Sequence, residues 1–202
     1  RSALISLSNL SDQRLRVAKT GDWFPNNPER ALANNSVAYT EKPDPGIFMK
    51  EWLSLYESKS GERGIFSRIS AKKKAAENGR RDVNWEFGTN PCSEIILRPN
   101  QFCNLTEVVC RPKDDRNSLA RKIRIATLLG TIQSTLTNFG YLRKRWITNT
   151  EEERLLGVSL TGIMDSQLLN GKEAGLEKTL EKLKQEAIDT NKVLAKKLGI
   201  PQ

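Results

Sequence analysis

Apolar side chains recur at helical spacing in two long stretches of the second half of the chain. After Asp114 and Asp115, one apolar stripe continues to about residue 138, and its spacing of three or four positions predicts an amphipathic helix that is deeply packed. Its members are Leu119, Ile123, Ile125, Ala126, Leu128, Leu129, Ile132 and Leu136. The second stripe predicts a helix over residues 173–198, because Gly199 and Pro201 stop the helical pattern there.

Shorter helices are predicted by local start and stop signals. They cover about residues 12–19, 47–56 and 68–78. Ser11 or Asp12 is suited to cap the first of these helices, and Gly79 is suited to end the third. The spacing from Thr150 to Glu153 matches a capping box, which predicts a further helix that begins near residue 151.

Extended segments are predicted between these helices. They cover residues 35–40 and 102–109, with a short apolar run at residues 95–97. Strands that alternate with helices along a chain indicate an α/β architecture. Since no internal repeat or linker divides the sequence, we expect one domain over residues 1–202.

The length and the two ends of the chain limit the class of protein. A chain of 202 residues is long enough for one domain with a core of its own. No apolar run approaches the roughly 18 residues that span a bilayer, and the first residues lack a signal-peptide pattern. We therefore expect a soluble, cytoplasmic protein with no membrane partner. Because the chain starts at Arg1 without a methionine and stops just after Pro201, we expect an internal fragment truncated at both ends.

Basic residues outnumber acidic ones, 33 to 24, which gives a formal net charge of +9. Such an excess raises the hypothesis of a basic nucleic-acid-binding module, with an affinity that falls steeply with salt. The basic residues cluster only at residues 72–74, 80–81 and 143–145 and otherwise alternate with acids. Solvated helix faces explain such clusters, and we expect no direct nucleic-acid partner.

The content of cysteine and histidine removes several classes of site. The chain has no histidine, which excludes Cys/His zinc sites and triads that use histidine as the base. The three cysteines are Cys92, Cys103 and Cys110. An odd number without a secretory signal argues against a disulfide scaffold, and without a CxxC pair we expect no metal site. If these thiols do chemistry, it is redox or radical chemistry.

The segment Asn90-Pro91-Cys92-Ser93-Glu94 places an amide, a thiol and a carboxylate at alternate positions. In extended backbone, alternate side chains project to one side, ~6.5–7 Å apart, so one substrate could meet all three groups. A thiol can carry a radical, a carboxylate can take a proton and an amide can bind hydroxyls. Since Pro91 cannot donate a backbone hydrogen bond, Cys92 is expected in a loop or at a sheet edge. The competing interpretation is a buried cysteine beside a turn residue and a surface charge.

This segment resembles the central loop of class II ribonucleotide reductases, most of all the monomeric ribonucleoside-triphosphate reductases. That family has an N-P-C-[GS]-E block and a second cysteine eleven residues after the first, which Cys92 and Cys103 match. In class I enzymes the spacing is longer and the block usually reads N-L-C-x-E, and class III enzymes lack the glutamate. Weaker similarity to the same branch, in the same order, is found at residues 1–4, 34–37 and 157–165.

The resemblance implies a role for each of these residues. Cys92 would be the thiyl-radical site that takes the 3′-hydrogen of the ribose, and Glu94 the general base at the 3′-hydroxyl. Asn90 would bind the ribose hydroxyls, and Cys103 would be half of the redox pair that ends as a disulfide. Cys92 is expected at the tip of a loop, with Asn90, Glu94 and Cys103 lining the same pocket.

The resemblance also implies the surroundings of this loop. The family fold is a ten-stranded α/β barrel with the loop threaded through its centre, and residues 1–202 would form part of it. The cofactor would be adenosylcobalamin, and the partners a ribonucleotide substrate, a nucleotide effector and a thioredoxin-type dithiol reductant. The second redox cysteine would lie before Arg1, and the loop that grips the substrate phosphates would follow Gln202.

Three alternative functions and the roles of two further residues, Cys110 and Glu107, stay open at this point. The alternatives are a dimeric class II or class I reductase, a basic nucleic-acid-binding module, and a remnant that folds but is inactive. Cys110 has no family role, and we expect a buried apolar thiol at a strand end. Glu107 is expected to be a solvated or structural carboxylate.

Overall fold

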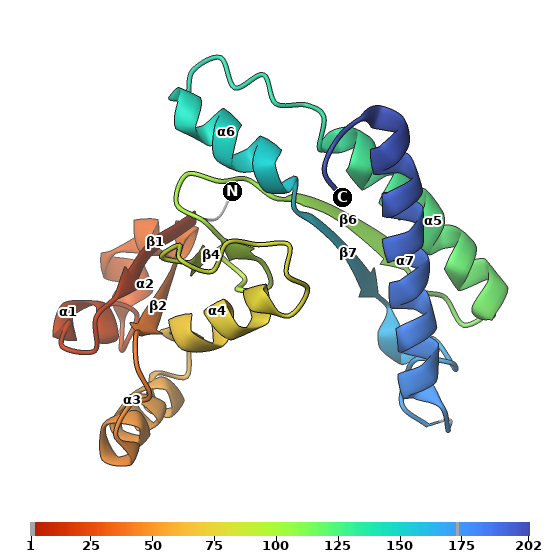
Figure 1. Ribbon diagram of the computed structural model, residues 1–202. Coiled ribbons are helices and arrows are strands. Elements are labelled where there is room, and N and C mark those ends of the chain that lie inside the picture. The colour runs from red at the N-terminus through yellow and green to blue at the C-terminus, as the bar shows by residue number, and fades with distance from the viewer. Residues whose placement is uncertain (1–2, 173) are drawn as a thin grey trace. The chain divides into compact units, whose positions relative to one another are not determined.

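The computed structural model describes residues 3–172 and 174–202 of the chain. Arg1 and Ser2, part of the family resemblance, and Glu173, the expected first residue of the last helix, lie outside the described residues. The chain forms two compact units, Arg1–Pro99 and Asn100–Gln202 (Figure 1). The expectation of one partial barrel domain over residues 1–202 stays a prediction.

The first unit contains a parallel sheet of three strands in the order β1-β2-β3. The strands are β1 (Ala3–Ser8), β2 (Ala33–Tyr39) and β3 (Gly64–Ser67). Helices form the crossovers that parallel neighbours require. They are α1 (Gln13–Arg16), α2 (Trp23–Asn26) and the 3₁₀ helix η1 (Pro28–Leu32) before β2, and α3 (Pro45–Ser58) before β3. Strands β1 and β3 were not predicted from the sequence.

Short-range capping explains where the helices of this unit begin. The Asp12 carboxylate accepts a hydrogen bond from the amide of Leu15, which confirms Asp12 as the cap of α1, although this helix ends at Arg16, before the expected residue 19. Asp44 caps α3 in the same way, through the amides of Gly46 and Ile47.

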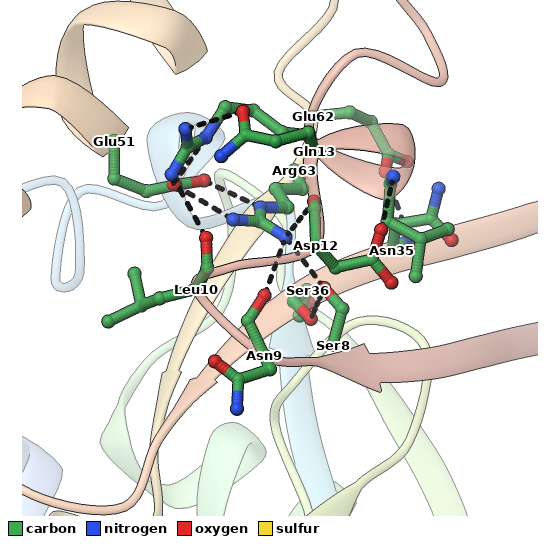
Figure 2. Close-up of polar contacts among 12 residues, drawn as sticks. Ser8, Asn9, Leu10, Asp12, Gln13, Asn35, Ser36, Glu51, Glu62 and Arg63 are labelled. Atoms are coloured by element: carbon green, nitrogen blue, oxygen red, sulfur yellow. Dashed lines mark hydrogen bonds and ion pairs between the residues drawn. The ribbon is translucent and has the colours of Figure 1, made fainter.

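A buried ion cluster holds the sheet of the first unit to its helices (Figure 2). Arg63, 2% exposed, forms a bidentate ion pair with Glu51, 1% exposed, with N–O distances of 2.6 and 2.9 Å. Arg16 binds the same carboxylate at 2.9 Å, and the second amino group of Arg63 donates to the Ser8 hydroxyl at 2.8 Å. These contacts join β1, α1, α3 and the residue just before β3. Burial acts to raise the pKa of Glu51, but hydrogen bonds and positive charge from Arg63 and Arg16 hold it below its ordinary value.

A second polar group in this unit lies beside the ion cluster. The ammonium group of Lys19 donates to the carbonyl of Ala33 and pairs with Glu62 at 2.8 Å. The other carboxylate oxygen of Glu62 accepts from the backbone amide of Asn35 at 2.9 Å. The start of β2 is therefore tied to the segment before β3 by side chains as well as by the sheet.

The rest of the first unit is a helix and a hairpin around a small apolar cluster. Helix α4 (Arg68–Ala76) buries Ala71 and Ala75 against Phe66 and Phe87. Most of the basic run at residues 72–74 is exposed, which confirms a solvated face. The hairpin pairs β4 (Gly88–Thr89) with β5 (Ile96–Leu97) in antiparallel register.

The second unit pairs two parallel strands and covers them with helices. The strands are β6 (Asn104–Val109) and β7 (Leu156–Thr161), and the connection contains α5 (Arg116–Gln133) and α6 (Lys144–Glu153). The 3₁₀ helix η2 (Ile163–Asp165) and α7 (Leu176–Leu198) follow. Figure 1 shows α7 running along α5. The core contains Val108, Cys110, Leu119, Ile123, Ala126, Leu169 and Leu183.

Helix α5 is less deeply packed than its apolar stripe predicts. Leu119, Ile123 and Ala126 are buried, but Leu129 is 57% exposed and Ile132 48%. The buried face continues instead through small residues (Thr127, Gly130 and Thr131). A methyl group on Gly130 would meet Leu156 at 2.2 Å, so the glycine allows α5 to approach β7 closely.

Two boundaries in the second unit differ from prediction for one physical reason. The prediction of a helix that begins near residue 151 is wrong, because α6 ends there. Glu153 is the last residue of α6, and Arg154 follows in a left-handed conformation. The strand expected from residue 102 begins at Asn104, because the amide of Phe102 donates to the Thr150 hydroxyl and not to a strand. Thr150 and Glu153 thus make tertiary contacts rather than a helix cap.

The predicted α/β class is confirmed by these parallel pairs with helical crossovers. The ten-stranded barrel is not shown, since within residues 3–172 and 174–202 the parallel sheets have three and two strands. The predicted helix end at Gly199 is confirmed: this residue has a φ of 66°, and the amide of Ile200 returns to the carbonyl of Ala195.

Candidate functional site

The Asn90–Glu94 segment forms the loop of the β4–β5 hairpin. The amide of Ser93 donates to the carbonyl of Asn90 at 3.0 Å, which closes a β-turn over residues 90–93. Pro91 and Cys92 occupy its two central positions, and proline is favoured at the first of these because its φ is fixed. The expectation that Cys92 lies in a loop is therefore confirmed, and the reason for it, the missing amide hydrogen of Pro91, fits the geometry.

Asn90 and Glu94 meet across this turn. The side-chain amide of Asn90 donates to the Glu94 carboxylate, and its oxygen accepts from the backbone amide of Ile95 at 3.0 Å. The prediction of extended backbone over this segment is wrong. The turn brings Asn90 and Glu94 together, and Ser93 has a φ of 65°. The amide and the carboxylate still share one side of the loop, so one small ligand could contact both.

A residue of β2 also contacts this loop through a hydrogen bond. The side-chain amide of Asn34 donates to the carbonyl of Pro91 at 2.8 Å, which fixes the peptide that leads into Cys92. Sequence reasoning missed this contact, because 57 residues separate the partners and no local pattern links them. The resembling segment at residues 34–37 was the one available signal.

The groups expected to react are accessible to solvent in this unit. Cys92, Ser93 and Glu94 are exposed, whereas Asn90 and Pro91 are half-buried. The interpretation of Cys92 as a buried, small apolar residue is therefore wrong. An exposed thiol beside a carboxylate and an amide can contact a ligand directly.

Cys103 lies in the second unit, one residue before β6 rather than within the strand. Its thiol is half-buried. Because Cys92 belongs to the first unit and Cys103 to the second, the expectation that the two thiols line one pocket stays a prediction.

The other two residues considered from the sequence are accounted for by the second unit. Cys110 is fully buried at the end of β6, where burial raises the pKa of its thiol, so the expected apolar role is confirmed. A methyl group on Gly162 would meet the carbonyl of Cys110 at 2.5 Å, so close packing surrounds this residue. Glu107 is exposed on β6, as expected of a solvated carboxylate.

Among residues 3–172 and 174–202, no group of three or more Cys, Asp or Glu side chains is arranged to hold a metal ion. In the same part of the chain, no helix is both long and apolar enough to cross a membrane.

No family model matches the chain, but the chain is similar in sequence to a known protein. The relative is the adenosylcobalamin-dependent ribonucleoside-triphosphate reductase of Lacticaseibacillus paracasei, 30% identical over 169 residues. The similar region covers 82% of this chain but 22% of the relative. The chain thus spans about a fifth of the length of this relative.

Proposed function

We propose that the chain is an internal part of the catalytic subunit of an adenosylcobalamin-dependent ribonucleoside-triphosphate reductase. The hairpin loop carries the proposal, because it presents the Cys92 thiol on a turn whose flanking Asn90 and Glu94 side chains are bound to each other. The relative from Lacticaseibacillus paracasei supports the reaction class. In the complete enzyme, we expect this loop to lie in a ten-stranded barrel, which would keep water from a sulfur radical.

Each of the three loop residues has its own role in the first step of the reaction. As a thiyl radical, the sulfur of Cys92 takes the hydrogen atom from the ribose 3′-carbon. The Glu94 carboxylate accepts the proton of the 3′-hydroxyl, and the Asn90 amide donates a hydrogen bond to a ribose hydroxyl. A positioned carboxylate base typically accelerates such a step by about 10²–10⁴-fold.

Reduction then needs two thiols, of which Cys103 would be one. The bond between C2′ and its oxygen breaks, and the hydroxyl leaves as water. Two thiols supply two electrons and two hydrogens and become a disulfide, and Cys92 returns its hydrogen atom to C3′. The net change is one ribonucleotide and one dithiol converted to one deoxyribonucleotide, one disulfide and water. The second thiol would come from a part of the enzyme outside these residues, and a thioredoxin-type dithiol would restore the pair.

The cofactor has no assigned site in this chain. When bound, adenosylcobalamin would supply the first radical of the proposed reaction. The cavity between α5 and α7, of about 480 Å³, matches a drug-sized ligand and not the much larger corrin. That cavity is therefore not assigned to the cofactor, and the roles given to Cys92, Glu94 and Asn90 do not depend on contacts with it. A nucleotide effector site and a cytoplasmic location belong to the same proposal.

The proposal is tested by assaying the complete enzyme with ribonucleoside triphosphate, a dithiol and adenosylcobalamin. We expect the deoxyribonucleotide to form, and to form only with the cobalamin present. If product requires a separate radical-generating subunit instead, the class I alternative is correct. If no deoxyribonucleotide forms under either condition, the proposed function is wrong.

Replacement of Glu94 by glutamine is expected to lower the reduction rate by about 10²–10⁴-fold while substrate still binds. Glutamine keeps the shape and an acceptor oxygen for Asn90, but it cannot take the 3′-hydroxyl proton. Both kcat and the substrate dissociation constant are measured. The control is Glu107→Gln, since that exposed glutamate lies outside the loop. A Glu94→Gln enzyme with an unchanged kcat would exclude Glu94 as the base.

The isolated 202-residue chain is expected to reduce no ribonucleotide. It contains Cys92 and Cys103 but, under the proposal, neither the second redox thiol nor the phosphate-binding loop. We also expect marginal stability, because large apolar residues such as Leu129 and Ile132 are exposed on α5. Multiple turnovers by this chain with adenosylcobalamin and dithiol would contradict the prediction.

A further inference from the structure

Two of the three residues that lead into β6, Gln101 and Phe102, are held by α6 and not by a neighbouring strand. The amide of Phe102 donates to the Thr150 hydroxyl at 3.1 Å. The side chain of Gln101 donates to the Glu153 carboxylate at 2.6 Å and to the carbonyl of Asn149 at 2.9 Å. One face of α6 thus supplies a backbone carbonyl and two side-chain acceptors to two consecutive residues.

The two contacts of Gln101 are buried, which makes them costly to break, and the bond between Phe102 and Thr150 is partly buried. Gln101 is 4% exposed, Thr150 3% and Glu153 2%. A buried donor that loses its partner incurs the full desolvation penalty, which is larger than the net gain of an ordinary hydrogen bond. The segment is therefore held in a single position by its polar groups.

Aromatic packing and the first bonds of β6 complete the restraint. The ring of Phe102 lies 4.9 Å from that of Phe139 and 4.7 Å from that of Trp146, both measured between centroids. On the other side of Cys103, the backbone and side-chain amides of Asn104 both donate to the carbonyl of Leu155, at 2.8 and 3.2 Å. Cys103 is thus held on both sides, while its own thiol is half-buried.

We propose that Thr150 and Glu153 are positioning residues for the Cys103 thiol, acting through Phe102 and Gln101. The inference rests on the proposed function, in which Cys103 is one of the two thiols that reduce the 2′-position. A thiol with this task must reach one carbon atom in one orientation, and a misplacement of about 1 Å can lower a rate by about 10²-fold. Contacts on both sides of Cys103 fix that orientation through the backbone.

The first test compares Thr150→Val with Thr150→Ser in the complete enzyme. Valine has the shape of threonine but no acceptor for the Phe102 amide, whereas serine keeps the hydroxyl. We expect Thr150→Val to lower deoxyribonucleotide formation at least tenfold and to leave exchange of the ribose 3′-hydrogen within twofold of wild type, because exchange depends on Cys92. Thr150→Ser is expected to restore reduction. If Thr150→Val lowers exchange and reduction equally, or lowers neither, the positioning role is wrong.

The second test measures the thiol itself and needs no turnover. In the complete enzyme without substrate, the rate at which iodoacetamide alkylates Cys103 is followed by mass spectrometry as a function of pH. We expect Thr150→Val to raise this rate about tenfold, as the loss of one partly buried hydrogen bond permits, and Thr150→Ser to match wild type. An unchanged rate in Thr150→Val would overturn the positioning role. If that variant fails to fold, Gln101→Met replaces it, since it removes the amide that binds Glu153, and the same changes are expected.

These outcomes separate the positioning role from the reaction. A wild-type complete enzyme that forms no deoxyribonucleotide overturns the proposed function, whatever the alkylation rates are. An active wild-type enzyme in which Thr150→Val has wild-type reduction and wild-type alkylation overturns the positioning role alone.

Discussion

The complete enzyme with Cys92→Ser is expected to form no detectable deoxyribonucleotide. A serine hydroxyl has nearly the size of a thiol, but its oxygen–hydrogen bond is too strong to be replaced by a radical that takes and returns a hydrogen atom. The turn should survive the change, because its hydrogen bonds are made by Asn90 and Ser93 and the Cys92 side chain is exposed. The loss of activity should therefore come without a loss of stability.

The assay is deoxyribonucleotide formation together with thermal unfolding of the same preparation. Cys110→Ala is the matched control, because it removes a thiol that is buried in the core and has no place in the loop. We expect that control to remain active at a temperature below its own unfolding transition. Turnover by Cys92→Ser above the background of the assay would exclude Cys92 as the radical site.

The Glu51→Gln chain is expected to lose about 3–5 kcal/mol of unfolding free energy in its first unit, the cost of breaking a buried pair. Glutamine fills the same space but leaves the guanidinium of Arg63, 2% exposed, without its countercharge. The change also removes the partner of Arg16 and so weakens the link between α1 and α3. Few single changes in this unit should have a larger effect on its stability.

The measurement is urea unfolding of the 202-residue chain, followed by tryptophan fluorescence, since Trp23, Trp52 and Trp85 all belong to the first unit. The control is Glu77→Gln, which breaks the exposed pair with Lys74 and should change stability by less than about 1 kcal/mol. A loss below 1 kcal/mol for Glu51→Gln would show that the pair is not the main polar contact of this unit.

The same carboxylate predicts how acid affects the fold. Because the folded-state pKa of Glu51 is below its ordinary value of 4.5, its contribution is present above that value and is lost as the pH falls through the folded-state pKa. Wild type should therefore lose more stability than Glu51→Gln as the pH falls below 4.5. Equal acid sensitivity of the two chains would contradict the low pKa.

Local signals in the sequence were sufficient for the loop that carries the proposed chemistry. Pro91 lacks an amide hydrogen, and this property alone predicted a loop at Cys92, where the structure has a turn. The caps at Asp12 and the stop at Gly199 were also predictable, since each depends on neighbours within a few residues. The proximity of Asn90 and Glu94 was predicted for the wrong reason, because extended backbone and a turn can both bring such residues to one side.

Contacts between distant residues were beyond the reach of the sequence. Thr150 and Glu153 have the spacing of a helix cap, but their partners are Phe102 and Gln101, about 50 residues earlier. The charge of Glu51 suggests a surface position on α3, whereas Arg63 and Arg16 bury it. The apolar stripe of α5 predicted a deeply packed helix, because the pattern cannot tell which of its members face a partner.

Exchange of label from the ribose 3′-position into water tests the central claim most directly. The Cys92 thiol, once it has taken the 3′-hydrogen, can exchange it with solvent before returning it. In the complete enzyme with 3′-labelled substrate, we predict no release of label by Cys92→Ser. We predict release of label without deoxyribonucleotide by Cys103→Ser, since hydrogen abstraction can begin but reduction cannot finish. Release of label by Cys92→Ser, together with none by Cys103→Ser, would contradict the account and exchange the roles of the two cysteines.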